Sequence, residues 1–125
     1  MKAQLRLLNK AGAQRMLTQK LVKLLMMKRY EVGNRKTLEE EINTTVDEFE
    51  GTMEFLKKFE FNDLMIEEQL AKVERAWERF LSSITQSGFD QMIEINGEVL
   101  IEMDKTVCLY ENLFRSQRIT NAYAG

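Results

Sequence analysis

The sequence of 125 residues contains no proline, and this absence constrains the fold more than any other feature. Proline interrupts helices because its ring removes a backbone N–H donor and clashes with the preceding turn, so a chain without it can form long helices. Leu, Met, Glu, Lys, Gln and Arg are abundant, and all are good helix formers. The length suits one domain with one core. The sequence therefore predicts an all-α fold in a single domain, residues 1–125.

Apolar residues recur at spacings of three and four, the spacing of one helix face, along four segments. The segments are residues 2–32, 36–59, 64–86 and 90–119. Short breaks separate them at Gly33-Asn34, Phe61-Asn62-Asp63 and Ser87-Gly88. Amphipathic helices joined by short turns pack as an antiparallel up-down-up-down four-helix bundle. Both ends of the chain are then expected at the same end of the bundle, as in a domain inserted between two membrane spans.

The apolar stripes predict the buried face of the second, third and fourth helices. The stripes are Leu38, Ile42, Val46, Phe49, Met53 and Leu56; Ile66, Leu70, Val73, Trp77, Phe80 and Ile84; and Ile93, Leu100, Val107 and Phe114, with Met103 and Tyr110 beside them. The spacing favours a core position for Trp77 over a ligand-binding one. A capping box at Thr37 to Glu40 is expected to start the second helix.

Composition excludes several functional classes. Without histidine, the usual zinc, haem and Cys/His nucleophile sites cannot form. Catalysis by carboxylates alone stays open as an alternative, but the pattern singles out no pair of acids, so we expect no metal, no cofactor and no enzymatic activity. A net charge of -2 argues against general nucleic-acid binding. Cys108 is the single cysteine and is expected to be an exposed, idle thiol. The chain has no apolar run of about 18 residues, the length that a membrane-spanning helix requires.

The first 36 residues carry ten Lys or Arg and a single acid, Glu31. Two interpretations remain open for this basic segment: it contacts anions or acidic surfaces, or it balances the acidic second and fourth helices. Arg15 stands out within it, because it interrupts a seam at helical spacing. The seam consists of Leu8, Ala11, Arg15, Thr18, Val22 and Leu25.

Ala11 and Gly12 are small, so a second helix can approach the backbone closely beside Arg15. In a two-fold dimer through the first helix, two Arg15 guanidinium groups would converge. At an effective dielectric near 20, two charges about 4 Å apart repel by roughly 4 kcal/mol. A flat oxyanion between them would offset this repulsion and accept paired hydrogen bonds. The alternative is an ion pair between Arg15 and Asp104 or Glu102, in a ligand-free dimerisation or protein-interaction bundle.

Residues Asn9 to Lys20 resemble the first helix of the PilJ-type sensor domain of type IV pilus chemotaxis transducers. The stretch is also similar to the signature helix of nitrate/nitrite sensor kinases. Eight positions are identical to the family pattern: Asn9, Ala11, Gly12, Gln14, Arg15, Met16, Leu17 and Gln19. Thr18 and Lys20 replace a serine and an arginine, and Ala13 stands where many members have a basic residue. Residues 77–80 and 96–100 show a looser likeness.

The resemblance implies a periplasmic ligand-binding domain of an inner-membrane receptor, either a chemoreceptor or a sensor kinase, anchored by membrane spans on both sides. In nitrate-binding members, the motif arginine of each of two subunits holds one nitrate at the dimer interface. Carried over, this implies a homodimer through the first helix that binds nitrate or a similar small anion. The ligand-binding residues would be Arg15 and Gly12, with Ala11 and Leu8 lining the same seam. The substitutions at Ala13 and Lys20 leave the identity of the ligand open.

Overall fold

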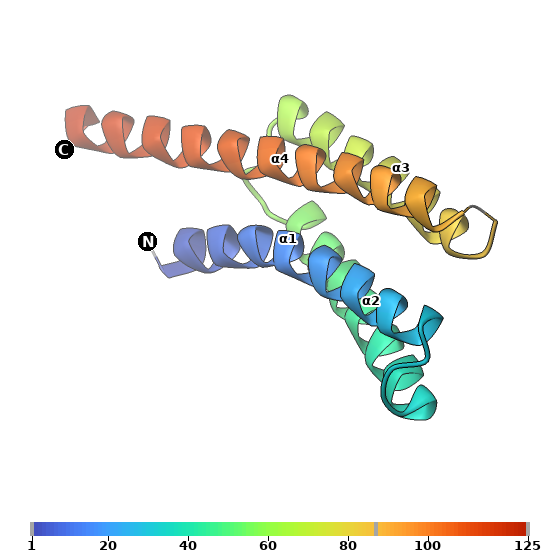
Figure 1. The fold of residues 1–125 in the computed structure, drawn as a ribbon. Coiled ribbons are helices and arrows are strands. Elements are labelled where there is room, and N and C mark those ends of the chain that lie inside the picture. Colours follow the sequence, from blue (N-terminus) through green and yellow to red (C-terminus); the bar gives the residue numbers. More distant parts are fainter. Residues whose placement is uncertain (1, 87, 125) are drawn as a thin grey trace.

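Four helices make up the computed structural model, which describes residues 2–86 and 88–124, with side chains described as far as residue 117. The helices are α1 (Lys2–Arg29), α2 (Arg35–Lys57), α3 (Leu64–Gln86) and α4 (Phe89–Ala124). Consecutive helices pack against each other, and α4 returns to pack against α1 (Figure 1). The start of α1 and the end of α4 lie at the same end of the molecule. The all-α class and the four-helix bundle are therefore confirmed.

The turn between α1 and α2 lies where the sequence placed it, but its chemistry differs. α1 ends at Arg29, three residues early, because Glu31 and Gly33 both adopt positive φ, at 55° and 87°. The Asn34 side chain then caps α2 by accepting a hydrogen bond from the Thr37 backbone N–H at 3.1 Å. The predicted capping box at Thr37 is therefore wrong. Asn34, not Thr37, is the N-cap residue, and the helix already begins at Arg35.

The other helix boundaries agree closely with the spacing of the apolar residues. Asp63 starts α3, since its carboxylate accepts a hydrogen bond from the Ile66 N–H at 2.8 Å. Gly88 lies between α3 and α4, whereas Ser87, the other residue of the predicted turn, lies outside the described residues. α4 continues to Ala124, five residues past the predicted end, and its final side chains also lie outside the description.

The core confirms the stripes predicted for α2 and α3, with Ile42, Val46 and Ile84 at its partly buried edge. Its centre is the stacked pair of Phe49 and Trp77, whose ring centroids lie 3.9 Å apart. Trp77 is buried, and its indole N–H donates to Glu50 at 3.1 Å. This confirms that Trp77 is a core residue.

The stripe predicted for α4 is wrong in part, because the buried seam lies one residue away from it. Ile93 is 40% exposed, and Leu100 and Val107 are only half-buried. The buried residues of α4 are Met92, Asn96, Val99, Met103, Thr106, Tyr110 and Phe114. Two of them are polar and find hydrogen-bond acceptors in the backbone. The Asn96 amide donates to the Thr18 carbonyl at 3.5 Å, and the Thr106 hydroxyl donates to the Glu102 carbonyl at 2.8 Å. An apolar pattern cannot anticipate such polar core positions.

Tyr110 anchors α4 against the linker between α2 and α3. The side chain is fully buried, and its hydroxyl lies 2.9 Å from Asn62 Oδ1, to which it donates. The Asn62 amide in turn donates to the Leu56 carbonyl at 2.8 Å. Burial raises the pKa of Tyr110 to about 12, since a buried phenolate is poorly solvated.

This pKa predicts a loss of stability at high pH. The unfolded chain ionises at the usual value of 10.0, so the contribution of Tyr110 is fully present below pH 10 and is lost as the pH rises toward 12. A difference of about two units corresponds to about 2 to 3 kcal/mol. Tyr110→Phe should not show this loss of stability at high pH, because phenylalanine does not ionise. At pH 8 the substitution should lower the free energy of unfolding by about 1 kcal/mol, because the hydrogen bond is lost. Urea unfolding at pH 8 and pH 11 measures both effects. The exposed Tyr30→Phe is the control, and equal pH dependence in all three proteins would contradict the assignment.

Candidate functional site

The helix that carries the resemblance, α1, turns Gln14 rather than Arg15 into the core. The buried residues of α1 are Leu7, Ala11, Gln14, Thr18, Leu21 and Leu24. Gln14 is fully buried, and its amide donates to the Phe49 carbonyl at 2.9 Å. The Arg15 side chain is half exposed. The expectation that Arg15 sits in the middle of the α1 seam is therefore wrong, because the neighbouring amide finds a partner inside the bundle and the guanidinium does not.

Arg15 instead reaches along the surface to α4. Its Nη1 donates to Asp104 Oδ2 at 2.6 Å, and both side chains are about half exposed. Asp104 was one of the two partners considered for Arg15 on the alternative interpretation, and this ion pair is confirmed. An exposed pair of this kind contributes between about 0 and 1 kcal/mol, because water screens both charges. The ion pair therefore contributes little to the stability of the fold.

A shallow groove of about 290 Å³ surrounds this ion pair between α1 and α4. It is lined by Ala11, Gly12, Arg15, Met103, Asp104, Val107, Cys108 and Glu111. Three of the four residues proposed from the sequence thus share one groove, whereas Leu8 is half-buried and does not line it. Cys108 is exposed, as expected. Sequence reasoning had placed Asp104 only as a possible partner and had missed Glu111, which sits seven residues further along α4.

Gly12 leaves the floor of the groove open. A Cβ atom built there would meet no heavy atom within 4 Å, so packing inside this chain does not require glycine. Glycine inside a helix destabilises it by roughly 0.5–1 kcal/mol relative to alanine. Gly51 and Gly97 are equally open, so openness by itself does not mark a site. What distinguishes Gly12 is its place beside Arg15 in the groove.

The outer face of α1 is partly apolar and is left uncovered by the side chains that the structure describes. Leu5 and Met16 are 60% and 71% exposed, and the small Ala13 lies between them on the same face. Together with Asn9 these residues are spaced by four, four and three, so they form one stripe along the helix. A depression of about 380 Å³ runs along its first half and is lined by Lys2, Leu5, Arg6, Asn9, Lys10 and Ala13. This stripe is a surface on which a second helix can pack.

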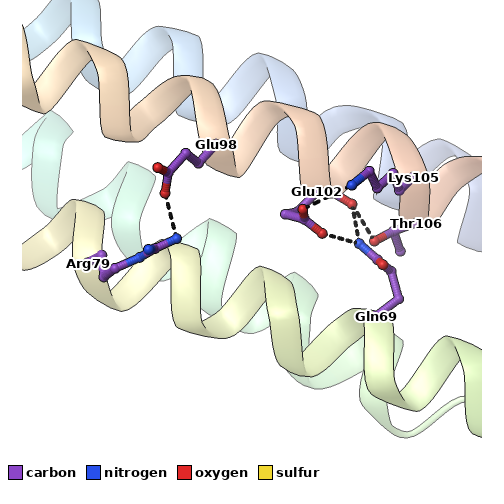
Figure 2. A network of polar contacts seen from close by, with 6 residues as sticks. All are labelled: Gln69, Arg79, Glu98, Glu102, Lys105 and Thr106. Atoms are coloured by element: carbon purple, nitrogen blue, oxygen red, sulfur yellow. Dashed lines mark hydrogen bonds and ion pairs between the residues drawn. The ribbon is translucent and has the colours of Figure 1, made fainter.

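A larger groove, of about 840 Å³, lies between α3 and α4 and was not anticipated. Figure 2 shows two polar contacts between these helices. Arg79 forms an ion pair with Glu98, and the Gln69 amide donates a hydrogen bond to the Glu102 carboxylate at 2.7 Å. Partial burial by itself would raise the pKa of Glu102, but the hydrogen bond from Gln69 and the charge of Lys105 hold it below the usual value. These polar contacts join α3 to α4 across the groove.

Within residues 2–86 and 88–124, no group of three or more Asp, Glu or Cys side chains is placed to hold a metal ion. In the same part of the chain, no helix is long and apolar enough to cross a membrane.

The different environments of Gln14 and Arg15 predict different costs of truncation. Gln14→Ala leaves a cavity in the core and removes the hydrogen bond to Phe49, so unfolding should become easier by about 2–4 kcal/mol. Arg15→Ala removes an exposed ion pair and should change the free energy of unfolding by no more than about 1 kcal/mol. Urea unfolding of the two variants measures the difference. A larger loss of unfolding free energy in Arg15→Ala than in Gln14→Ala would show that Arg15 is the core residue.

Comparison with known proteins places this geometry in a family. Residues 3–94 match the family model PilJ, described as the N-terminal region of type IV pili methyl-accepting chemotaxis transducers. The match includes Gly12 and Arg15 and ends before Asp104. Neither the search of curated proteins nor the search of solved structures found a match. The match covers most of the chain and contains the motif helix, and the chain therefore belongs to the PilJ family of N-terminal sensory domains of chemotaxis transducers.

Proposed function

We propose that this chain is the periplasmic ligand-binding domain of a membrane-anchored receptor and that it binds a small oxyanion, such as nitrate, across a homodimer formed by α1. The observation that carries the proposal is the position of Arg15. Its guanidinium lies half exposed at the edge of a groove, beside the open backbone of Gly12. Family membership gives the sensory role, and the ligand and the dimer are inferred from the chemistry of this surface.

The dimer follows from the outer face of α1. Leu5, Ala13 and Met16 form an apolar stripe that is exposed among the described residues, and Gly12 lies next to it. Small residues let two helix backbones come close, and the apolar side chains supply area to bury. In a two-fold arrangement the same face meets itself, and Arg15, which lies about 100° round the helix from Met16, flanks the contact in each subunit. α1 is strongly basic, so such a contact needs a negative charge to balance it.

A planar oxyanion suits this contact chemically. A guanidinium is flat, permanently charged and able to donate two parallel hydrogen bonds to two oxygens of one anion. Two guanidinium groups facing each other can hold one nitrate between them, and the exposed Gly12 backbone lets the ligand sit close to the helix. The likeness of residues 9–20 to the signature helix of nitrate/nitrite sensor kinases supports the same class of ligand.

One observation favours a second function. Arg15 already has a partner in Asp104, so its positive charge is compensated in a bundle without ligand. The chain would then serve as a dimerisation or protein-interaction bundle that joins a membrane anchor to an output domain. The two functions differ in one measurable respect, because the interaction bundle responds to no small anion.

Thermal unfolding with nitrate, nitrite, sulfate, acetate and chloride at matched ionic strength tests the oxyanion site. A ligand at about 100 times its Kd stabilises the folded state by about 2.7 kcal/mol, so the melting temperature should rise by several degrees. Arg15→Ala should abolish the rise and leave helicity intact. Lys23→Ala, which removes a charge from the same helix two turns away, should preserve it. No rise with any anion in a sample shown to be dimeric would instead support the interaction bundle.

Gly12→Ala separates helix stability from ligand binding. In the ligand-free protein this substitution should stabilise α1 by about 0.5–1 kcal/mol, because alanine fits the open space and favours the helix. The added methyl group stands where the proposed ligand and the second helix approach, so the shift produced by nitrate should shrink. Gly51→Ala provides the same gain at an open position of α2, away from the groove. An unchanged nitrate shift in Gly12→Ala would remove Gly12 from the site.

A further inference from the structure

We infer that Asp104 is an internal counter-ion that competes with an incoming anion for Arg15, which favours singly charged ligands and links ligand binding to the α1–α4 contact. The inference rests on the proposed function, since it assigns a competitor and a ligand class to the same site. Asp104 lies beyond the residues that match the family model, so the family match does not supply this role.

The geometry of the ion pair sets up the competition. Asp104 Oδ2 lies 2.6 Å from Arg15 Nη1, one of the two terminal nitrogens that form the end-on fork of the guanidinium. A flat oxyanion that accepts paired hydrogen bonds at this end needs both terminal nitrogens. The carboxylate therefore competes with the ligand for the N–H donors of Nη1, and its negative charge would stand beside the ligand. Both side chains are half exposed, so either can turn into solvent without breaking the core.

The charge of the groove decides which anions can compete. Its charged lining residues are Arg15, Asp104 and Glu111, and one positive and two negative charges give a net charge of -1. Each further negative charge on the ligand meets repulsion from both carboxylates, while the attraction comes from one guanidinium per subunit. A singly charged oxyanion such as nitrate is therefore favoured over a doubly charged one such as sulfate.

The same contact has a consequence for the bundle. Among the described residues, Arg15–Asp104 is the only ion pair that joins α1 to α4. The two helices also share a hydrogen bond from Gln4 to Gln117 and one from Asn96 to the Thr18 carbonyl. An anion that takes Arg15 from Asp104 removes one of these links and leaves the others in place. Ligand binding thus favours an arrangement in which α1 and α4 are less tightly joined.

The experiment compares Asp104→Asn with Glu111→Gln, two substitutions that remove the same charge from the same groove. Only Asp104 pairs with Arg15. Calorimetric titration with nitrate and with sulfate gives the affinity, at a protein concentration where sedimentation shows the dimer. Unfolding without ligand gives the stability of each variant, and Arg15→Ala provides the baseline for a site without its cation.

Asp104→Asn should slightly lower the melting temperature without ligand and strengthen nitrate binding roughly two- to fivefold, the range that an exposed ion pair supports. The substitution should also reduce the ratio of the affinity for nitrate to the affinity for sulfate. Glu111→Gln should leave the ligand-free melting temperature unchanged and strengthen nitrate binding less. In Asp104→Asn, stability thus falls while nitrate affinity rises, and this combination identifies competition. If Asp104 had a purely structural role, its loss would lower both the stability and the affinity.

Other outcomes overturn the inference. Unchanged or weaker nitrate binding in Asp104→Asn, with binding still lost in Arg15→Ala, removes Asp104 as a competitor and leaves the proposed function standing. Equal gains in Asp104→Asn and Glu111→Gln show that the general field of the groove acts, rather than the ion pair. Absence of binding in the wild type and in every variant overturns the proposed function, and the inference falls with it.

Discussion

The hydrogen bond from the Gln14 amide to the Phe49 carbonyl fixes the rotation of α1 in the bundle. The donor and acceptor lie 2.9 Å apart, and Gln14 is fully buried. A buried amide is stable only where it finds a partner, so α1 cannot turn about its axis without leaving Gln14 unsatisfied. The next residue along the helix lies about 100° further round. Arg15 is therefore directed out of the core, toward the groove between α1 and α4, and the candidate site exists on the surface for that reason.

Polar core positions recur through the bundle and serve the same purpose. Asn96 bonds to the Thr18 carbonyl across α1 and α4, and Tyr110 bonds to Asn62 at the linker between α2 and α3. Each bond requires one relative position of two elements, whereas apolar contacts tolerate small rotations. Gln14 Oε1 has no hydrogen-bond partner among the described residues, so this specificity is obtained at some cost in stability. A sensory bundle needs defined helix positions, because a ligand acts by favouring one arrangement over another.

The contacts between α1 and α4 differ in strength along their length. The buried Asn96 bond and the apolar core hold the two helices together, while Arg15 and Asp104 meet in water at the surface. Weak, exposed contacts are the ones that a small ligand can exchange without unfolding the domain. Between α3 and α4, the Gln69 amide donates to the partly buried Glu102 carboxylate, and Arg79 pairs with Glu98. The exposed Arg15–Asp104 pair is thus the contact between α1 and α4 that a small ligand can exchange most easily.

By itself the sequence determined the helices, their order and the neighbourhood of the site. The absence of proline and the spacing of residues such as Leu70, Val73 and Phe80 are local properties of the chain, and they predicted the bundle and two of its stripes. The motif around Gly12 and Arg15 is local too, and the family match confirmed the PilJ-type sensory domain that it indicated.

Only the tertiary structure decided which face of α1 and of α4 turns inward. Gln14 and Arg15 are adjacent polar residues, so spacing could not tell which of them the core accepts. Asn96 and Thr106 are polar as well, and an apolar pattern passes over them. The outcome depends on acceptors far away in sequence, Phe49 for Gln14 and Asp104 for Arg15, which are 35 and 89 residues distant. A polar side chain is buried where a distant partner satisfies it, and that partner is known only once the helices have packed.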